Sequence, residues 1–312
     1  MSEPVSNQSL VTVKLILVQL FWAGTFVASE IALQTEPPAF TAVVRFVVTT
    51  SCYCGLLGLM NCRGSAATLP RLRRVTRRGW FVLAGMGFSG VFMYTLLLHA
   101  GLERTTAAYA ALLIPTTQPI FTAALSRIVF RDPISAGTLA GLILGLAGAS
   151  LVISQGAGSM SLLSANVTII ASAFAFSCYA VCSKLAPVEL TSIETTTVSF
   201  LFGTLFLLPM PFIFREAIDI TAATPRFWLS ILYLVIFATL LPYLWWNEAV
   251  RAIGSAKTGV FTFLMPPLAV VLAAAVLGHA ATTQQIVGGV LALAGVAFAT
   301  TELPFRRRVT SQ

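Results

Sequence analysis

The sequence has little charge and almost no histidine. Of its 312 residues, 10% are charged and 57% are hydrophobic, and only 2 are histidine. A soluble domain of average composition has about a quarter of its residues charged. A chain this apolar lacks the polar side chains to cover its surface in water. Its composition therefore excludes an ordinary soluble domain and makes lipid the expected solvent.

The sequence also lacks the signatures of enzymes and cofactor sites. It has no glycine-rich phosphate loop of the Walker type, so we do not expect direct ATP hydrolysis. The five cysteines show no convincing metal-ligand spacing; they are Cys52, Cys54, Cys62, Cys178 and Cys182. No Ser/His/Asp or metal constellation stands inside an apolar stretch. We therefore expect no catalytic residues, no metal and no cofactor.

Long apolar stretches dominate the chain instead. An α-helix needs about 20 residues to cross roughly 30 Å of hydrocarbon. Stretches of this length follow one another along almost the whole chain, which predicts an all-α membrane protein with ten transmembrane helices. The predicted spans are 11–33, 39–60, 80–100, 105–127, 134–153, 163–184, 193–214, 226–249, 255–276 and 283–302.

Basic residues gather on alternate connections between these spans. The connection at 61–79 contains six arginines and residues 306–308 are all arginine, whereas 34–38, 154–162 and 277–282 contain no Lys or Arg. Cationic loops stay on the cytoplasmic side of a membrane. With ten spans, this pattern places both termini in the cytoplasm. The net charge of +8 thus fits a lipid bilayer as partner, and we expect no nucleic acid.

The ends of the two halves of the chain resemble each other. Residues 129–149 align with 276–296 without a gap, and Gly141 then falls on Gly288. The offset of 147 residues also places one intramembrane proline of the first half on one of the second half. These prolines are Pro119 and Pro266.

The starts of the two halves match as well. Residues 21–29 resemble 175–183 at an offset of 154, which also places the "RF" at 45–46 on the "SF" at 199–200. We therefore predict two five-helix repeats. Because five is odd, the second copy is inverted in the membrane, a plan common among secondary transporters. The repeats are residues 1–153 and 154–312.

Several motifs together resemble the drug/metabolite transporter superfamily, specifically the EamA-type exporters. They are "FWAGTFVA" followed by "RF", "ALLIPTTQPIF", "FRDPISAGTLAGLILGLAG", "PYLWWNEAVRAIGSAKTG" and "PPLAVVLAAAVLGHAATTQQIVGGVLALAG". The resemblance implies export of small organic metabolites, such as amino acids, across a bacterial inner membrane by alternating access. It also makes the glycine-rich fifth and tenth spans scaffold and a candidate homodimer contact. The alternatives are an importer or exchanger of another solute, such as a nucleotide sugar or organic cation, a channel, or an intramembrane enzyme.

The resemblance also points to a set of substrate-binding residues. In this superfamily the first, third, fourth, sixth and eighth spans line a central cavity, and aromatic faces suit an amphipathic metabolite. Each residue could equally make ordinary lipid or core contacts. The candidates are Trp22, Tyr94, Tyr109, Phe176, Tyr179 and Tyr243, with Gln118 as a hydrogen-bonding partner beside a predicted kink.

Prolines and charges inside the spans complete the candidate residues. Pro119 and Pro266 remove a backbone hydrogen bond, so each is a hinge for alternating access or a static bend. Ionisable groups within a span usually face a cavity or a partner. Glu30 and Arg45 are placed to pair with each other, and Glu248 has Arg251 one turn away. We expect structural ion pairs, with ion or proton coupling as the alternative.

Overall fold

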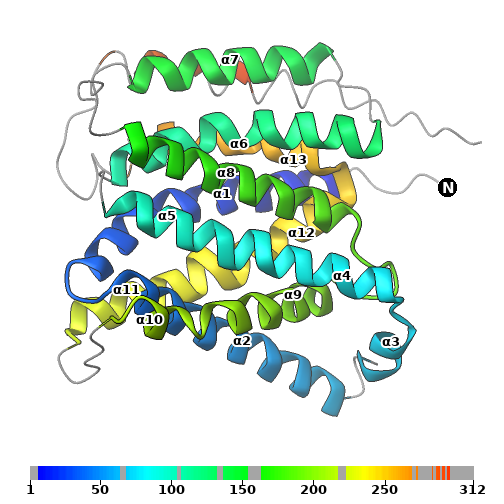
Figure 1. Ribbon diagram of the computed structural model, residues 1–312. Helices are drawn as coiled ribbons and strands as arrows, with labels where there is room; N and C mark the ends of the chain where they lie inside the picture. The colour runs from blue at the N-terminus through cyan, green and yellow to red at the C-terminus, as the bar shows by residue number, and fades with distance from the viewer. Residues whose placement is uncertain are drawn as a thin grey trace, which may run out of the picture.

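The computed structural model describes residues 6–63, 68–103, 107–131, 136–153, 163–216 and 223–268, together with 272, 283, 286–288, 290–291 and 294–295. All regular secondary structure in these residues is helical, which confirms the all-α prediction for this part of the chain. The long helices lie side by side in one bundle (Figure 1).

In the described residues, the first half contains five long rods and one short helix. Its third rod consists of three consecutive segments, α4, η1 and α5, of which η1 is a π-helix. The elements are α1 (Ser6–Leu33), α2 (Pro38–Cys62), α3 (Thr68–Arg74), α4 (Arg77–Met86), η1 (Gly87–Met93), α5 (Tyr94–Leu102), α6 (Ala107–Phe130) and α7 (Ala136–Ile153).

The second half follows a similar order. Its third rod is again interrupted by a π-helix, η3. The elements are α8 (Leu163–Lys184), α9 (Ser192–Leu207), α10 (Met210–Ile213), α11 (Pro225–Val235), η3 (Ile236–Leu240), α12 (Leu241–Ile253), α13 (Ser255–Val260) and the 3-10 helix η4 (Phe261–Leu264). Most of the tenth predicted span, 283–302, lies outside the described residues.

Within the described residues, six helices are long and apolar enough to cross a membrane. They are Ser9–Leu33, Pro38–Cys62, Arg77–Leu102, Val167–Lys184, Ser192–Ile213 and Pro225–Ile253. The full count of ten spans stays a prediction.

Capping residues explain where several of these helices begin and end. Thr76 and Thr224 accept backbone N–H bonds in the first turns of α4 and α11. Thr191 and Glu194 form a capping box at the start of α9, which satisfies free backbone donors. Gly254, with φ 86°, ends α12 and turns the chain directly into α13. Such a backbone angle is readily adopted only by glycine.

The packing of the two halves is reciprocal. The third rod of the first half packs on α8 and α9, and the third rod of the second half packs on α1 and α2. Similarly, α6 packs on α8, while η4 packs on α1. Residues at corresponding positions meet, with ring centroids 5.4 Å apart for Trp22 and Phe176 and 5.6 Å apart for Phe46 and Phe200. The two halves thus contact each other through equivalent surfaces.

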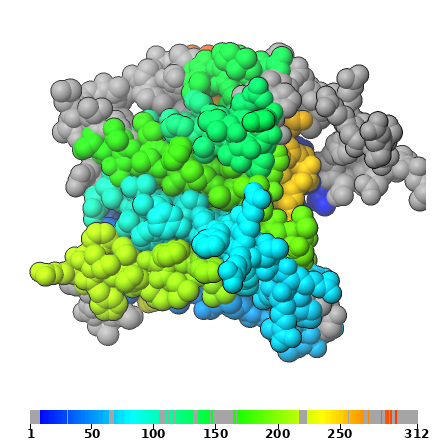
Figure 2. All heavy atoms as spheres, turned by 45° about the vertical axis from the view of Figure 1, so that its right-hand side comes forward, coloured from blue at the N-terminus to red at the C-terminus, as the bar shows by residue number. Residues whose placement is uncertain are grey.

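The bundle has two distinct ends. The α3 end holds α3 and the arginine-rich connection between α2 and α4, and the α10 end holds the short helix α10 (Figure 1). In the space-filling view, the segment around α3 projects at the margin of the molecule (Figure 2). The core lies between these ends, where helices from both halves meet.

Candidate functional site

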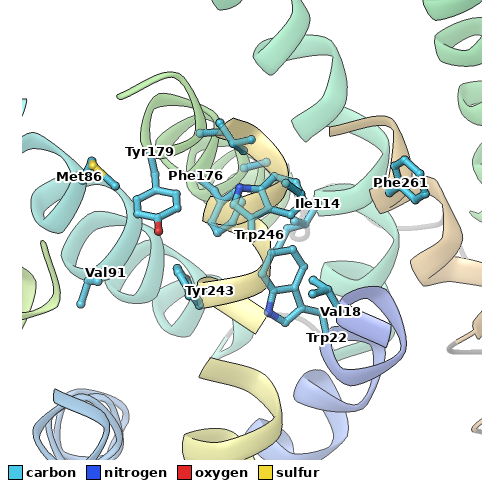
Figure 3. Close-up of a cluster of buried hydrophobic side chains, with 14 of the residues drawn as sticks. Val18, Trp22, Met86, Val91, Ile114, Phe176, Tyr179, Tyr243, Trp246 and Phe261 are labelled. Atoms are coloured by element: carbon cyan, nitrogen blue, oxygen red, sulfur yellow. The ribbon is translucent and has the colours of Figure 1, made fainter. Parts of the chain in front are cut away.

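An aromatic cluster fills the middle of the bundle. Trp22 comes from α1, Phe176 and Tyr179 from α8, and Tyr243 and Trp246 from α12 (Figure 3). The ring of Phe176 lies 5.4 Å from Trp22, 5.4 Å from Tyr179 and 5.9 Å from Tyr243, measured between centroids. These are contact distances for aromatic pairs, which prefer tilted and edge-to-face arrangements. The sequence-predicted aromatic residues on α1, α8 and α12 therefore form one group.

A small cavity lies beside this cluster. Five predicted substrate-binding residues line it, and its volume is about 20 Å³, which is room for about one water molecule. In this conformation the cavity is therefore too small to hold an amino acid. The five residues are Trp22, Tyr94, Gln118, Phe176 and Tyr243.

The other two predicted substrate-binding residues are placed differently. Tyr179 is fully buried behind the cavity lining, and its hydroxyl donates to Asn247 Oδ1 at 2.9 Å and accepts from Asn247 Nδ2 at 2.7 Å. Asn247 also binds Ser183 and Thr196, at 2.7 and 2.8 Å. Tyr109 lies in the first turn of α6, and its side chain is outside the described residues.

Arg45, for which the sequence predicts an ion pair with Glu30, lies in the cavity wall. Arg45 as a whole is only 3% exposed, and its Nε donates to Thr239 Oγ1 at 2.8 Å. Within the described residues, no carboxylate lies at ion-pair distance from it. The side chain of its expected partner, Glu30, is outside the described residues.

Two π-helices border the site, and the sequence did not predict them. A π-helix shifts the backbone hydrogen bonds to i→i+5 and often marks a functional site. Trp22 Nε1 donates to the carbonyl oxygen of Ala238 in η3 at 3.0 Å, and Tyr53 donates to that of Leu240. In η1, the carbonyl oxygen of Gly90 accepts from Tyr243 at 3.2 Å. Side chains from one half thus bind π-helical carbonyls of the other half.

Gly90, in the third predicted span, is a sequence signal for the close approach between η1 and a neighbouring side chain. A Cβ atom added to Gly90 would lie 2.3 Å from the ring of Tyr179. No real side chain fits at that distance, so this position requires glycine while the ring is in place. The sequence showed the glycine but could not show the ring that faces it.

Charged contacts close the α3 end. Lys14 Nζ lies 2.6 Å from Glu248 Oε2 and joins α1 to α12, while Arg71 lies 3.3 Å from the buried carboxylate of Glu194. Arg251 is the neighbour expected for Glu248. It instead donates to the carbonyl oxygen of Leu190 and to the hydroxyl of Thr195. Glu248 is therefore ion-paired with a residue of the other half.

A different carboxylate closes the α10 end. Glu216 accepts hydrogen bonds from the backbone N–H groups of Ala39 and Phe40, at 2.9 and 2.8 Å. These are the first free donors of α2, because Pro38 has no N–H. A cavity of about 360 Å³ lies beside this contact and is also lined by His99.

The two predicted hinge prolines lie on helices that pack together. Pro119 is buried inside α6, and this helix remains α-helical on both sides of the proline. In the span that contains Pro266, by contrast, the chain forms the 3-10 helix η4 just before the proline. A Cβ added to Gly259 would lie 3.7 Å from the Cα of Pro119, so α13 passes close to the first proline. The hinge role of both prolines stays a prediction.

Comparisons with known proteins agree with this architecture. The model of the EamA-like transporter family matches residues 10–154 and 163–301. The uncharacterized transporter YetK of Bacillus subtilis is 26% identical, over 94% of this chain and 87% of its own. A probable terminal-alkyne amino-acid exporter of Streptantibioticus cattleyicolor is 27% identical over 95% of both chains. A probable amino-acid metabolite efflux pump of Salmonella typhimurium is 25% identical, over 90% of this chain and 91% of its own.

One solved crystal structure shows the same fold. It covers 94% of this chain with a TM-score of 0.75, at 19% sequence identity. At this identity the likeness concerns the fold alone.

Proposed function

Since the chain belongs to the EamA-like transporter family, we propose that it is a secondary transporter that exports amino acids or related small organic metabolites by alternating access. Family membership makes it a multi-pass membrane protein and a transporter rather than an enzyme. The substrate class is supported by the two relatives named as amino-acid exporters or efflux pumps.

The observation that carries the proposal is a cavity whose wall comes from both halves. Trp22 and Phe176, which correspond at the offset of 154 residues, both line it and contact each other edge to face. Gln118 and Met265, which correspond at the offset of 147, line it as well. Movement of one half against the other would therefore change the size and access of this cavity. Substrate sites between inverted repeats work in this way.

Contacts between the halves at both ends supply the closures that such a cycle needs. The Lys14–Glu248 pair lies at the α3 end, and Glu216 binds the start of α2 at the α10 end. In an alternating-access cycle, one closure opens while the other stays shut. We assign the α3 end to the cytoplasm because it carries the arginine-rich connection.

Transport by purified protein in proteoliposomes tests this function. Liposomes loaded with a panel of radiolabelled amino acids should release at least one of them faster than protein-free liposomes, with saturation at high internal concentration. Trp22→Ala should slow this release, whereas Trp80→Ala, at an exposed position away from the cavity, should not. Uptake without efflux would make the protein an importer, and flux that never saturates would indicate a channel.

A further inference from the structure

The central cavity has a positive charge with no counter-charge in its described wall. Arg45 is 3% exposed and lines the cavity, which has no Asp or Glu among its lining residues. A guanidinium has five N–H donors, and only Nε of Arg45 has a hydrogen-bond acceptor within the described part of the chain. Its two terminal nitrogens are thus available to an acceptor. A cation inside a membrane is costly and usually serves a partner or a ligand.

A second donor in the same wall also lacks a partner. Gln118 is 2% exposed, and its Nε2 is buried without a hydrogen bond among the described residues. Buried polar groups are nearly always hydrogen-bonded, so an unsatisfied amide donor beside a cavity calls for an acceptor there. Arg45 and Gln118 come from α2 and α6, and both line the one cavity. The missing partner is therefore an acceptor that carries negative charge.

We propose that Arg45 and Gln118 bind the carboxylate of the transported substrate, and that the substrates are small monocarboxylates with an apolar or aromatic body. This inference rests on the proposed transport function and adds a chemical class to it. Guanidinium and carboxylate match in shape and form the stronger, charge-assisted type of hydrogen bond. Thr239, in η3, is a positioning residue because its hydroxyl oxygen accepts from Arg45 Nε and fixes the plane of the guanidinium.

The other residues of the cavity determine which net charge and which apolar portion of a ligand fit the site. The second half has Ser199 at the position that corresponds to Arg45, so the symmetry adds no second cation. One guanidinium suits a monoanion better than a phosphate dianion. Trp22, Phe176 and Tyr243 provide aromatic faces for the apolar body. In a zwitterionic substrate, the same faces can hold the ammonium group by cation–π contact.

Binding measurements with an acid and its isosteric amide test the assignment. Purified full-length protein in detergent is titrated with phenylacetate and with phenylacetamide, and then with L-phenylalanine and L-phenylalaninamide, by isothermal calorimetry. We expect each acid to bind at least about tenfold more tightly than its amide, as hydrogen bonds to a charged group imply. Arg45→Gln should remove this preference and Arg45→Lys should retain part of it. Arg78→Gln removes one exposed cation outside the cavity and should leave the preference unchanged.

The outcomes separate this inference from the transport function. Equal binding of acid and amide by the wild type, binding of neither acid, or a full acid preference in Arg45→Gln would overturn the carboxylate site, even if the liposomes transport an amine or a neutral solute. An acid preference that depends on Arg45, in a protein that transports nothing, would support the site and reject the proposed function. If Arg45→Gln does not fold, Thr239→Val replaces it, because it keeps the cation but removes its acceptor. A reduced preference in Thr239→Val supports the site, and an unchanged one contradicts it.

Discussion

Replacing Glu216 by alanine should open the α10 end of the protein. The carboxylate accepts from the two leading N–H groups of α2, for which Pro37, at the N-cap, provides no side-chain acceptor. Glu216 therefore caps α2 from the other half of the chain. Losing an N-cap costs about 0.5–2 kcal/mol. If that free energy stabilises only the closed state, the substitution raises the ratio of open to closed protein by about 2- to 30-fold.

Cysteine labelling measures this shift. Thr25→Cys, in a background without the native cysteines, places a thiol in the wall of the central cavity, where Thr25 is 6% exposed. A membrane-impermeant maleimide applied from the periplasmic side should label it about 2- to 30-fold faster in Glu216→Ala than in the parent. Glu216→Gln, which keeps an acceptor oxygen, should show a smaller increase. Glu189→Ala is the control, because it removes an exposed carboxylate that is not part of this contact. Equal labelling rates in Glu216→Ala and the parent would refute the closure assigned to this residue.

Three further changes test other parts of the account. Asn247→Leu removes the acceptor of two buried hydroxyl donors, Tyr179 and Ser183, which should lower the free energy of unfolding by about 2–6 kcal/mol. An unchanged melting temperature in detergent would contradict this. Pro119→Ala and Pro266→Ala should each fold but slow net transport and shift cavity labelling toward one side, and unchanged rates and labelling in both would leave the prolines as static bends. A reporter cysteine in the connection at 61–79 should be labelled in inverted vesicles and protected in intact cells, and strong labelling in intact cells would reverse the assigned topology.

The helices could be predicted from the sequence because the length and apolarity of a span are local properties. The aromatic candidates followed from the family resemblance, and five of the seven predicted binding residues line one cavity. The partners of charged residues were less predictable. Glu248 pairs with Lys14, 234 positions away, rather than with Arg251 one turn along its own helix. Sequence proximity indicates which groups could meet, but the packing of α1 against α12 decides which do.

The two π-helices show even more clearly that contacts between distant parts of the chain cannot be predicted from local sequence. Their residues have no composition that separates them from the α-helices on either side. The carbonyl of Ala238 binds the indole of Trp22 from the other half, and that of Gly90 binds the hydroxyl of Tyr243. These acceptors are used only when the two halves are assembled, so no local pattern reveals them. The hydrogen-bond partner of Arg45 could not be predicted for the same reason, since its acceptor, Thr239, lies in η3 of the other half.

Counterflow in proteoliposomes tests the central claim most directly, namely that one cavity between the two halves is exposed alternately to each side. Liposomes preloaded with an unlabelled substrate should take up the labelled substrate from outside transiently, above its equilibrium level and without any ion gradient. The overshoot should be lost in Trp22→Ala, which alters the cavity wall, and kept in Trp80→Ala, at a position outside it. Uptake that rises only to equilibrium, at a rate that preloading does not change, would contradict alternating access and would indicate a passive pore.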